Sequence, residues 1–220
     1  MRRTSHRGLL LMWLLPVVVV GGLLVVLSAK MTPPSVRYVC PPDCGRPPTG
    51  TPVATNPRFI APDGSFSVSY PAQGSAYKIT TRADGVTGEF VGGDGGTLRL
   101  FSVPAAGRSP RQIAEKLVAD TFPDARTAYE IPNAMVGYQP GYGEAADFWP
   151  QGSTSTYQKT RIVVMVAVKN DLALVAGAAG PFHAFGPDFG AGKPSGANLQ
   201  LALDMGKYVN SFSWRGDPPR

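Results

Sequence analysis

Alternating hydrophobic and polar positions dominate the chain from residue 66 onward and predict a largely antiparallel sheet. The segment FSVSY at 66–70 follows the turn sequence APDG and alternates between large apolar and small polar side chains. Such alternation is typical of a strand. The pattern continues at 77–81, 87–91 and 97–103, with the glycine-rich run 92–96 as a tight connection. These segments predict a meander of short strands.

A helix is predicted directly after this meander. Ser109, Pro110 and Gln112 match a capping box with proline at the first helical position. The apolar side chains that follow share one helical face: Ile113, Ala114, Leu117, Val118 and Phe122. Pro123 ends the pattern. A helix with one apolar face packs that face on a sheet.

A hairpin is the clearest strand pattern in the second half of the chain. RIVVMVAV at 161–168 meets LALVAGAA at 172–179 across Lys-Asn-Asp, which predicts a tight turn. Both segments are apolar at nearly every position, which indicates that both faces of the sheet are covered there. Weaker strand patterns precede the hairpin at 127–131, 135–138 and 143–149.

A closing helix is predicted at about 198–212, where it would cover the second face. The predicted fold class is therefore α+β: an antiparallel β-sheet covered by helices on both faces, in an α/β/α arrangement, preceded by one transmembrane helix. The α+β domain is expected to span 58–216, with a tail at 217–220.

The predicted transmembrane helix is the uncharged segment 9–27, which is long enough to cross a hydrocarbon core of about 30 Å. Three arginines precede this segment and Lys30 follows it. The positive-inside rule then places residues 1–8 in the cytoplasm and the rest outside a plasma membrane that the chain crosses once. A cleaved signal peptide is the alternative, because Ser28 and Ala29 are small residues at the end of the apolar run.

Most of the chain's positive net charge comes from residues beside the predicted membrane segment. The whole chain carries +6, but four of its basic residues flank the apolar segment. From Met31 onward 17 basic residues face 15 acidic ones, which is too small an excess for a nucleic-acid-binding surface. No nucleic-acid partner is expected.

The segment 28–57 reads as an extracytoplasmic linker, with eight prolines between Met31 and Pro57. The chain's two cysteines, Cys40 and Cys44, lie in this linker. Oxidising conditions outside a cell favour a disulfide between them, and a bridge that closes so short a loop would act as a local staple. A link between chains and a reactive pair are the alternatives.

Aromatic side chains in loop-like surroundings are the candidates for binding. Tyr138, Tyr142 and Trp149 lie between the predicted strands, and His183 lies in a later glycine-rich stretch. Such rings either cap the ends of the sheet or form a partner or ligand surface. His183 is also the one histidine outside the N-terminal segment, so a hydrolase site near it is the alternative, although no G-x-S-x-G motif is present. No metal or cofactor site is predicted.

Three short segments carry a resemblance to a known fold: DGSFSVSYPA at the first strand, SPRQIAEKL at the first helix and VNSFSW at the end of the last. In element order and in these segments the chain resembles the PsbP-like family, named after the extrinsic photosystem II protein and including bacterial membrane-anchored proteins. The resemblance implies a sheet between helices and an accessory, assembly or binding role. The function expected is thus a non-enzymatic, single-pass membrane-anchored domain that binds a protein partner, an envelope component or a small ligand.

Overall fold

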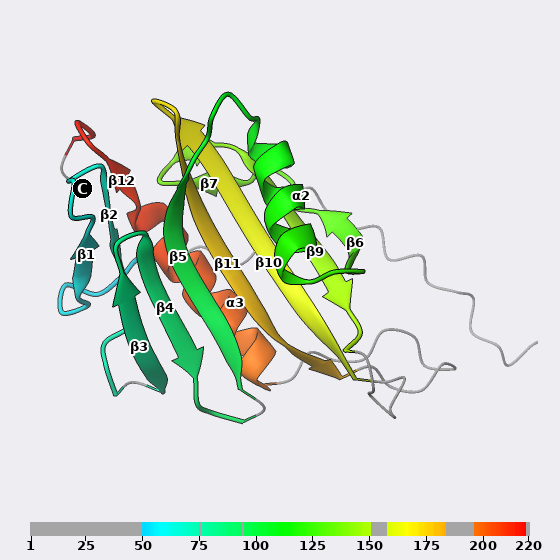
Figure 1. The fold of residues 1–220 in the computed structure, drawn as a ribbon. Coiled ribbons are helices and arrows are strands. Elements are labelled where there is room, and N and C mark those ends of the chain that lie inside the picture. Colours follow the sequence, from blue (N-terminus) through cyan, green and yellow to red (C-terminus); the bar gives the residue numbers. More distant parts are fainter. Residues whose placement is uncertain (1–49, 75, 94, 151–157, 184–195, 219–220) are drawn as a thin grey trace, which may run out of the picture. The chain divides into compact units, whose positions relative to one another are not determined.

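A computed structural model describes residues 50–218 except 75, 94, 151–157 and 184–195. Its centre is a seven-stranded antiparallel sheet (Figure 1). In sheet order the strands are β3 (Tyr77–Arg82), β4 (Gly85–Phe90), β5 (Gly96–Pro104), β11 (Leu172–His183), β10 (Gln158–Lys169), β9 (Tyr142–Phe148) and β6 (Arg126–Glu130).

The hairpin predicted from the two apolar segments is confirmed and lies in the middle of this sheet. β10 and β11 pair over their full length, from Gln158 opposite His183 to Lys169 opposite Leu172. Asn170 and Asp171 form the turn with φ of 52° and 56°, because two-residue hairpins of the favoured hand need positive φ at both positions. β5 pairs with the outer edge of β11 and joins the meander to the hairpin.

Two smaller sheets complete the strand structure. β1 (Arg58–Ile60) and β12 (Ser213–Trp214) pair on either side of β2 (Phe66–Ser69), so the end of the chain returns to its first described strands. β7 (Met135–Val136) and β8 (Gln139–Pro140) form a two-stranded sheet. The first predicted strand therefore does not belong to the meander but to this separate three-stranded sheet.

Two α-helices pack against the large sheet, α2 (Pro110–Thr121) and α3 (Gly196–Tyr208), and a 3₁₀ turn, η2 (Val209–Ser211), follows the second. The capping box at the start of α2 is confirmed: the Gln112 amide donates to the Ser109 hydroxyl, and the Ser109 amide donates to Gln112 Oε1 at 2.9 Å. α2 packs mainly on β9 and β10, and α3 on β5 and β11. In Figure 1 α2 lies in front of the sheet and α3 behind it.

Neighbouring residues of each central strand contribute to different cores because strand side chains alternate between faces. Val164 and Val175 pack with Ile113 of α2 in one cluster. Met165 and Leu174 pack in the other cluster, which contains the α3 side chains and Phe212.

The prediction of a sheet covered by helices on both faces is wrong. The described residues are mostly antiparallel strand with two short α-helices, each packed mainly on two of the seven strands. A helix with its side chains is about 10–12 Å wide, whereas seven strands about 4.8 Å apart span roughly 29 Å. Single helices of this kind leave much of each face uncovered.

No helix in the described part of the chain is both long enough and apolar enough to cross a membrane. This finding corrects the prediction of a membrane-spanning helix at 9–27. It also corrects the single-pass plasma-membrane location and the membrane as a partner. The segment itself lies outside the described residues. Cys40 and Cys44 also lie outside them, so the described residues hold no disulfide and the predicted staple has no support. The domain boundaries stay predictions.

Candidate functional site

The four predicted site residues lie at two different ends of the sheet. Tyr142 begins β9, and Tyr138 lies in the β7–β8 turn with 54% of its surface exposed. Trp149 follows the other end of β9 and is 44% exposed. Trp149 is seven positions after Tyr142, which corresponds to roughly 23 Å along a strand. His183 ends β11 at the Trp149 end of the sheet, opposite Gln158, and its side chain lies outside the described part. The structure therefore does not unite the four.

Tyr142 belongs to a polar network that ties α2 to β6 and β9. The Arg111 guanidinium lies 4.3 Å from the centre of the Tyr142 ring and donates two hydrogen bonds to Glu130, at 2.7 and 2.9 Å. Glu144 is 2% exposed and accepts from the hydroxyls of Thr127 (3.1 Å) and Tyr142 (3.4 Å). Burial, and then the negative charge of Glu144, raises the pKa of Tyr142 to about 12. Its hydroxyl stays protonated at neutral pH and serves this network.

A second charged cluster lies beside Trp149. Asp147 accepts from Lys159 at 2.5 Å and from Arg161 at 2.5 and 3.1 Å, and all three side chains are at most 14% exposed. Lys159 Nζ lies 5.7 Å from the centre of the Trp149 ring. Arg161 lies at 5.6 Å from the ring of Tyr129. These contacts place Trp149 against paired charges, an arrangement that sequence reasoning missed because Asp147, Lys159 and Arg161 are separated along the chain.

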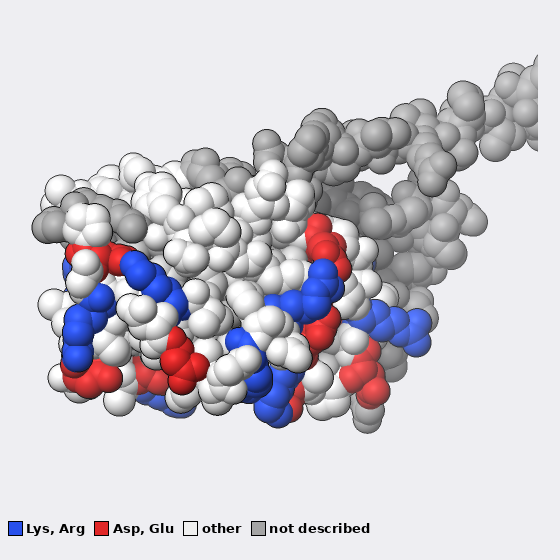
Figure 2. Space-filling model, turned by 90° about the horizontal axis from the view of Figure 1, so that it is seen from above, with Lys and Arg blue, Asp and Glu red and all other residues white. Residues whose placement is uncertain are grey.

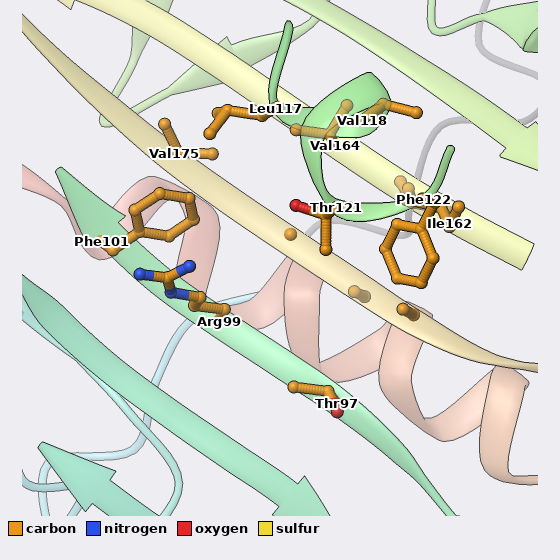
Figure 3. A pocket seen from close by; sticks show the side chains of 14 residues that line it. Thr97, Arg99, Phe101, Leu117, Val118, Thr121, Phe122, Ile162, Val164 and Val175 are labelled. Atoms are coloured by element: carbon orange, nitrogen blue, oxygen red, sulfur yellow. The ribbon is translucent and has the colours of Figure 1, made fainter. Parts of the chain in front are cut away.

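The described surface has an apolar hollow of about 250 Å³ between α2 and β5 (Figure 3). Its floor is formed by side chains of β10 and β11, including Ile162, Val164 and Val175. We call this feature the α2 hollow. Leu117 and Thr121 of α2 line one side of it.

The opposite side of the α2 hollow consists of Phe101 and Arg99 from β5. The Arg99 guanidinium lies 4.0 Å from the centre of the Phe101 ring and donates to Asp84 Oδ2 at 2.7 Å. Its charge is therefore balanced at the rim. The stacked guanidinium and ring make this wall continuous.

The depth of the α2 hollow follows from small side chains on β11. On the α2 side of this strand, Val175 is followed by Gly177 and Ala179, which project far less than the leucine on the other face. α2 packs mainly on β9 and β10 and does not extend over this part of β11. A hollow forms where small floor residues meet an area that no helix covers.

The chemistry of the α2 hollow suits apolar contact. Arg99 is the one ionisable residue that lines it, and an arginine guanidinium stays protonated in proteins. No group of three or more His, Cys, Asp or Glu side chains that could hold a metal occurs among the described residues. Elsewhere, Figure 2 shows basic and acidic side chains close together on the face seen from above, without a large area of one sign. The hollow offers a mainly apolar surface with two threonines and one arginine, whose charge is balanced by Asp84.

Sequence reasoning missed the α2 hollow, although one signal was present. Leu117 was expected to face the sheet, and the hairpin was expected to be covered on both faces. The alternation within LALVAGAA places two leucines and two alanines on one face, and one valine, two alanines and the glycine on the other, so the second face is the smaller in volume. That difference marks the face that is left open.

Comparisons with known proteins yield structural neighbours alone, because no protein-family model and no curated protein sequence matches the chain. The Saccharomyces cerevisiae Ran-binding protein Mog1p superposes with a TM-score of 0.50 at 10% identity, over 73% of this chain and 95% of Mog1p. A mutant of Mog1 gives 0.49 at 12% identity, over 73% and 96%. A Bacteroides thetaiotaomicron protein gives 0.44 at 13% identity over 74% of this chain, which spans about half of that protein's length.

At these identities the likeness to Mog1p shows the fold alone. The chain has the Mog1/PsbP-like fold, in agreement with the resemblance drawn from its sequence.

Proposed function

We propose that this chain is a non-enzymatic protein-binding domain that receives its partner on the open sheet face beside α2. The observation that carries the proposal is the α2 hollow, where buried side chains such as Phe101 and Val175 form the floor and wall of an uncovered area. Apolar concavities at a protein surface are typical of interaction sites.

The structural similarity to Mog1p supports a protein-binding role in general terms. Mog1p is a Ran-binding protein, so this fold serves protein binding in at least one case. Function does not follow from fold alone, and the partner of this chain is a separate question. The likeness raises the expectation of a protein partner without naming one.

The proposal assigns no catalysis to the α2 hollow. General acid–base chemistry needs a group that gains and loses a proton near neutral pH, and a guanidinium held by Asp84 does not do so. Arg99 is suited to keeping the rim of the hollow rigid and its charge balanced.

Site-specific photocrosslinking tests the proposal. A benzophenone amino acid is introduced at Thr121, an exposed residue on the edge of the hollow, and in a matched variant at Leu203, which is 49% exposed on α3. We expect one defined protein to crosslink from position 121 in extracts of the native host and not from position 203.

Binding of that protein, once purified, is then measured by calorimetry. Thr121→Lys should weaken it at least about tenfold, because an unpaired ammonium would lose its hydration at the interface, whereas Leu203→Lys should leave it unchanged. Thr121 is the last residue of α2, where a cation is favoured. Leu203 is half exposed on α3 and lysine is a good helix former, so both variants should stay folded. Equal affinity of the two variants, or equal crosslinking from the two positions, would refute the proposal.

A further inference from the structure

Gly177 lies in the middle of β11, in the floor of the α2 hollow, and its presence needs an explanation. It is paired with Arg99 on β5 and with Val164 on β10, so it belongs to the central part of the sheet. Glycine inside a strand weakens the strand because it gains flexibility in the unfolded chain and has no side chain to pack. A glycine that persists there usually meets a local requirement.

Other strand glycines of this chain meet such a requirement. A β-carbon at Gly85 in β4 would collide with the carbonyl oxygen of Leu100, and one at Gly143 in β9 would lie 3.0 Å from the β-carbon of Ala134. Gly85 also has a φ of 151°, within the range that favours glycine. Close packing or backbone conformation accounts for both.

Neither cause applies to Gly177. A β-carbon there would have one neighbour within 4 Å, the Arg99 carbonyl oxygen at 4.0 Å, and its φ is not positive. Gly177 lines the α2 hollow together with Thr121 and Phe101, so a larger side chain there would take up part of its space. A β-carbon would therefore fit at this position, and the glycine leaves the space above it in the hollow open.

We propose that the space above Gly177 receives one bulky, uncharged, aromatic side chain of the protein partner. The inference rests on the proposed function and specifies how the partner is anchored. Glycine in a strand often marks the close approach of a ligand. Aromatic anchors that fill a pocket are the usual energetic centre of a protein interface.

The charges around the hollow determine that the anchor is uncharged. Arg99, the one ionisable residue that lines the hollow, is paired with Asp84 at 2.7 Å. A charged group entering the hollow would lose its hydration without meeting an unbalanced opposite charge. A neutral ring loses little hydration and gains apolar contact.

The size and shape of the hollow favour a side chain over a free small molecule. Pockets for drug-sized ligands are about 300–1,000 Å³ and enclose most of the ligand. This hollow has about 250 Å³ and is open to solvent on one side. A partner that presents the ring would itself cover the open side.

Toluene and indole, which model phenylalanine and tryptophan side chains, test the inference by NMR titration of the ¹⁵N-labelled full-length chain. We expect chemical-shift changes centred on Gly177, Phe101 and Thr121. One methylene in an apolar pocket alters affinity roughly 10–200-fold, so Gly177→Val should weaken probe binding at least about tenfold and Gly177→Ala by less.

Gly177→Val should not lower the melting temperature, because the new side chain has room and valine favours strands. Thr80→Val, on the exposed edge strand β3, is the matched control and should leave the affinity unchanged. Probe binding that persists in Gly177→Val, or shifts centred elsewhere, overturns the inference. Those outcomes leave the crosslinking from Thr121 and the effect of Thr121→Lys unaffected, and these two measurements decide whether the face binds a protein.

Discussion

Replacement of Tyr77 by phenylalanine tests the most strongly buried polar contact between the sheet and α3. The Tyr77 hydroxyl donates to Asp204 Oδ2 at 2.6 Å, and the two residues are 5% and 9% exposed. Tyr77→Phe keeps the ring and its edge-on contact with Phe90, but Asp204 loses one hydrogen-bond donor. The substitution therefore isolates the hydroxyl.

The expected loss of stability follows from the charge of the acceptor. Hydrogen bonds to charged groups contribute about 1.5–3 kcal/mol, so Tyr77→Phe should lower the free energy of unfolding at pH 8 by about 2 kcal/mol. For a domain of this size about 1 kcal/mol corresponds to roughly 2–4 °C in melting temperature. The control is Tyr70→Phe, because the Tyr70 hydroxyl has no hydrogen bond to another described residue.

The same contact makes stability depend on alkaline pH. Burial, the hydrogen bond to Asp204 and the charge of Asp204 together raise the pKa of Tyr77 well above its ordinary value. Burial and the charge of Asp204 raise the pKa of Tyr208 to about 12. Above pH 10 the unfolded tyrosines release protons that the folded ones keep, so stability is fully present below about pH 10 and falls as pH rises, by about 1.4 kcal/mol per unit for each tyrosine.

Urea unfolding of the wild type and of Tyr77→Phe, at pH 8 and at half-unit steps from pH 10 to 11.5, measures both effects. The variant should be less stable at pH 8, and its stability should fall less steeply above pH 10 because one of the titrating groups is gone. A loss below about 0.5 kcal/mol at pH 8, less than a typical hydrogen bond, would refute the reasoning. So would parallel pH profiles.

Three further substitutions test the sheet and its helix cap by thermal unfolding. Ser109→Ala removes the capping hydroxyl and should cost about 1 kcal/mol, and Ser109→Thr should restore most of it. Asp147→Asn should lower the free energy of unfolding by about 3 kcal/mol or more, because Lys159 and its neighbouring arginine would stay buried without the carboxylate. An unchanged free energy of unfolding would show that the two buried cations are stable without this carboxylate. Gly141→Ala should destabilise the fold because the new methyl group collides with the Val166 carbonyl, and an unchanged melting temperature would contradict that contact.

Local sequence patterns were sufficient to locate most elements. The alternation at 77–81 and 97–103 corresponds to β3 and β5, and the capping box at Ser109 begins α2 where expected. These signals act between residues that are close in the chain: a period of two for strands and a side chain three positions from the amide it caps. The local sequence pattern is therefore enough to predict these strands and the start of the helix.

Pairing between distant segments could not be obtained in the same way. FSVSY reads as a strand wherever it pairs, and its partners β1 and β12 are short strands, one of them about 147 residues further along the chain. The charged cluster at Asp147 has the same origin, since its two cations come from the neighbouring strand β10. Only the register of the folded sheet places them together.

The open face beside α2 shows why an apolar strand need not be a covered one. The hairpin residues were interpreted as buried on both sides because nearly all of them are apolar, and on the α3 side Leu174 does pack against that helix cluster. On the α2 side the same strand presents Gly177 and Ala179. These side chains are too small to fill the space beside α2, and no described helix covers it. Apolar character alone therefore predicts that a strand is central in its sheet. The volume of the side chains on each face, taken separately, predicts where the sheet lacks a covering layer and a partner can enter.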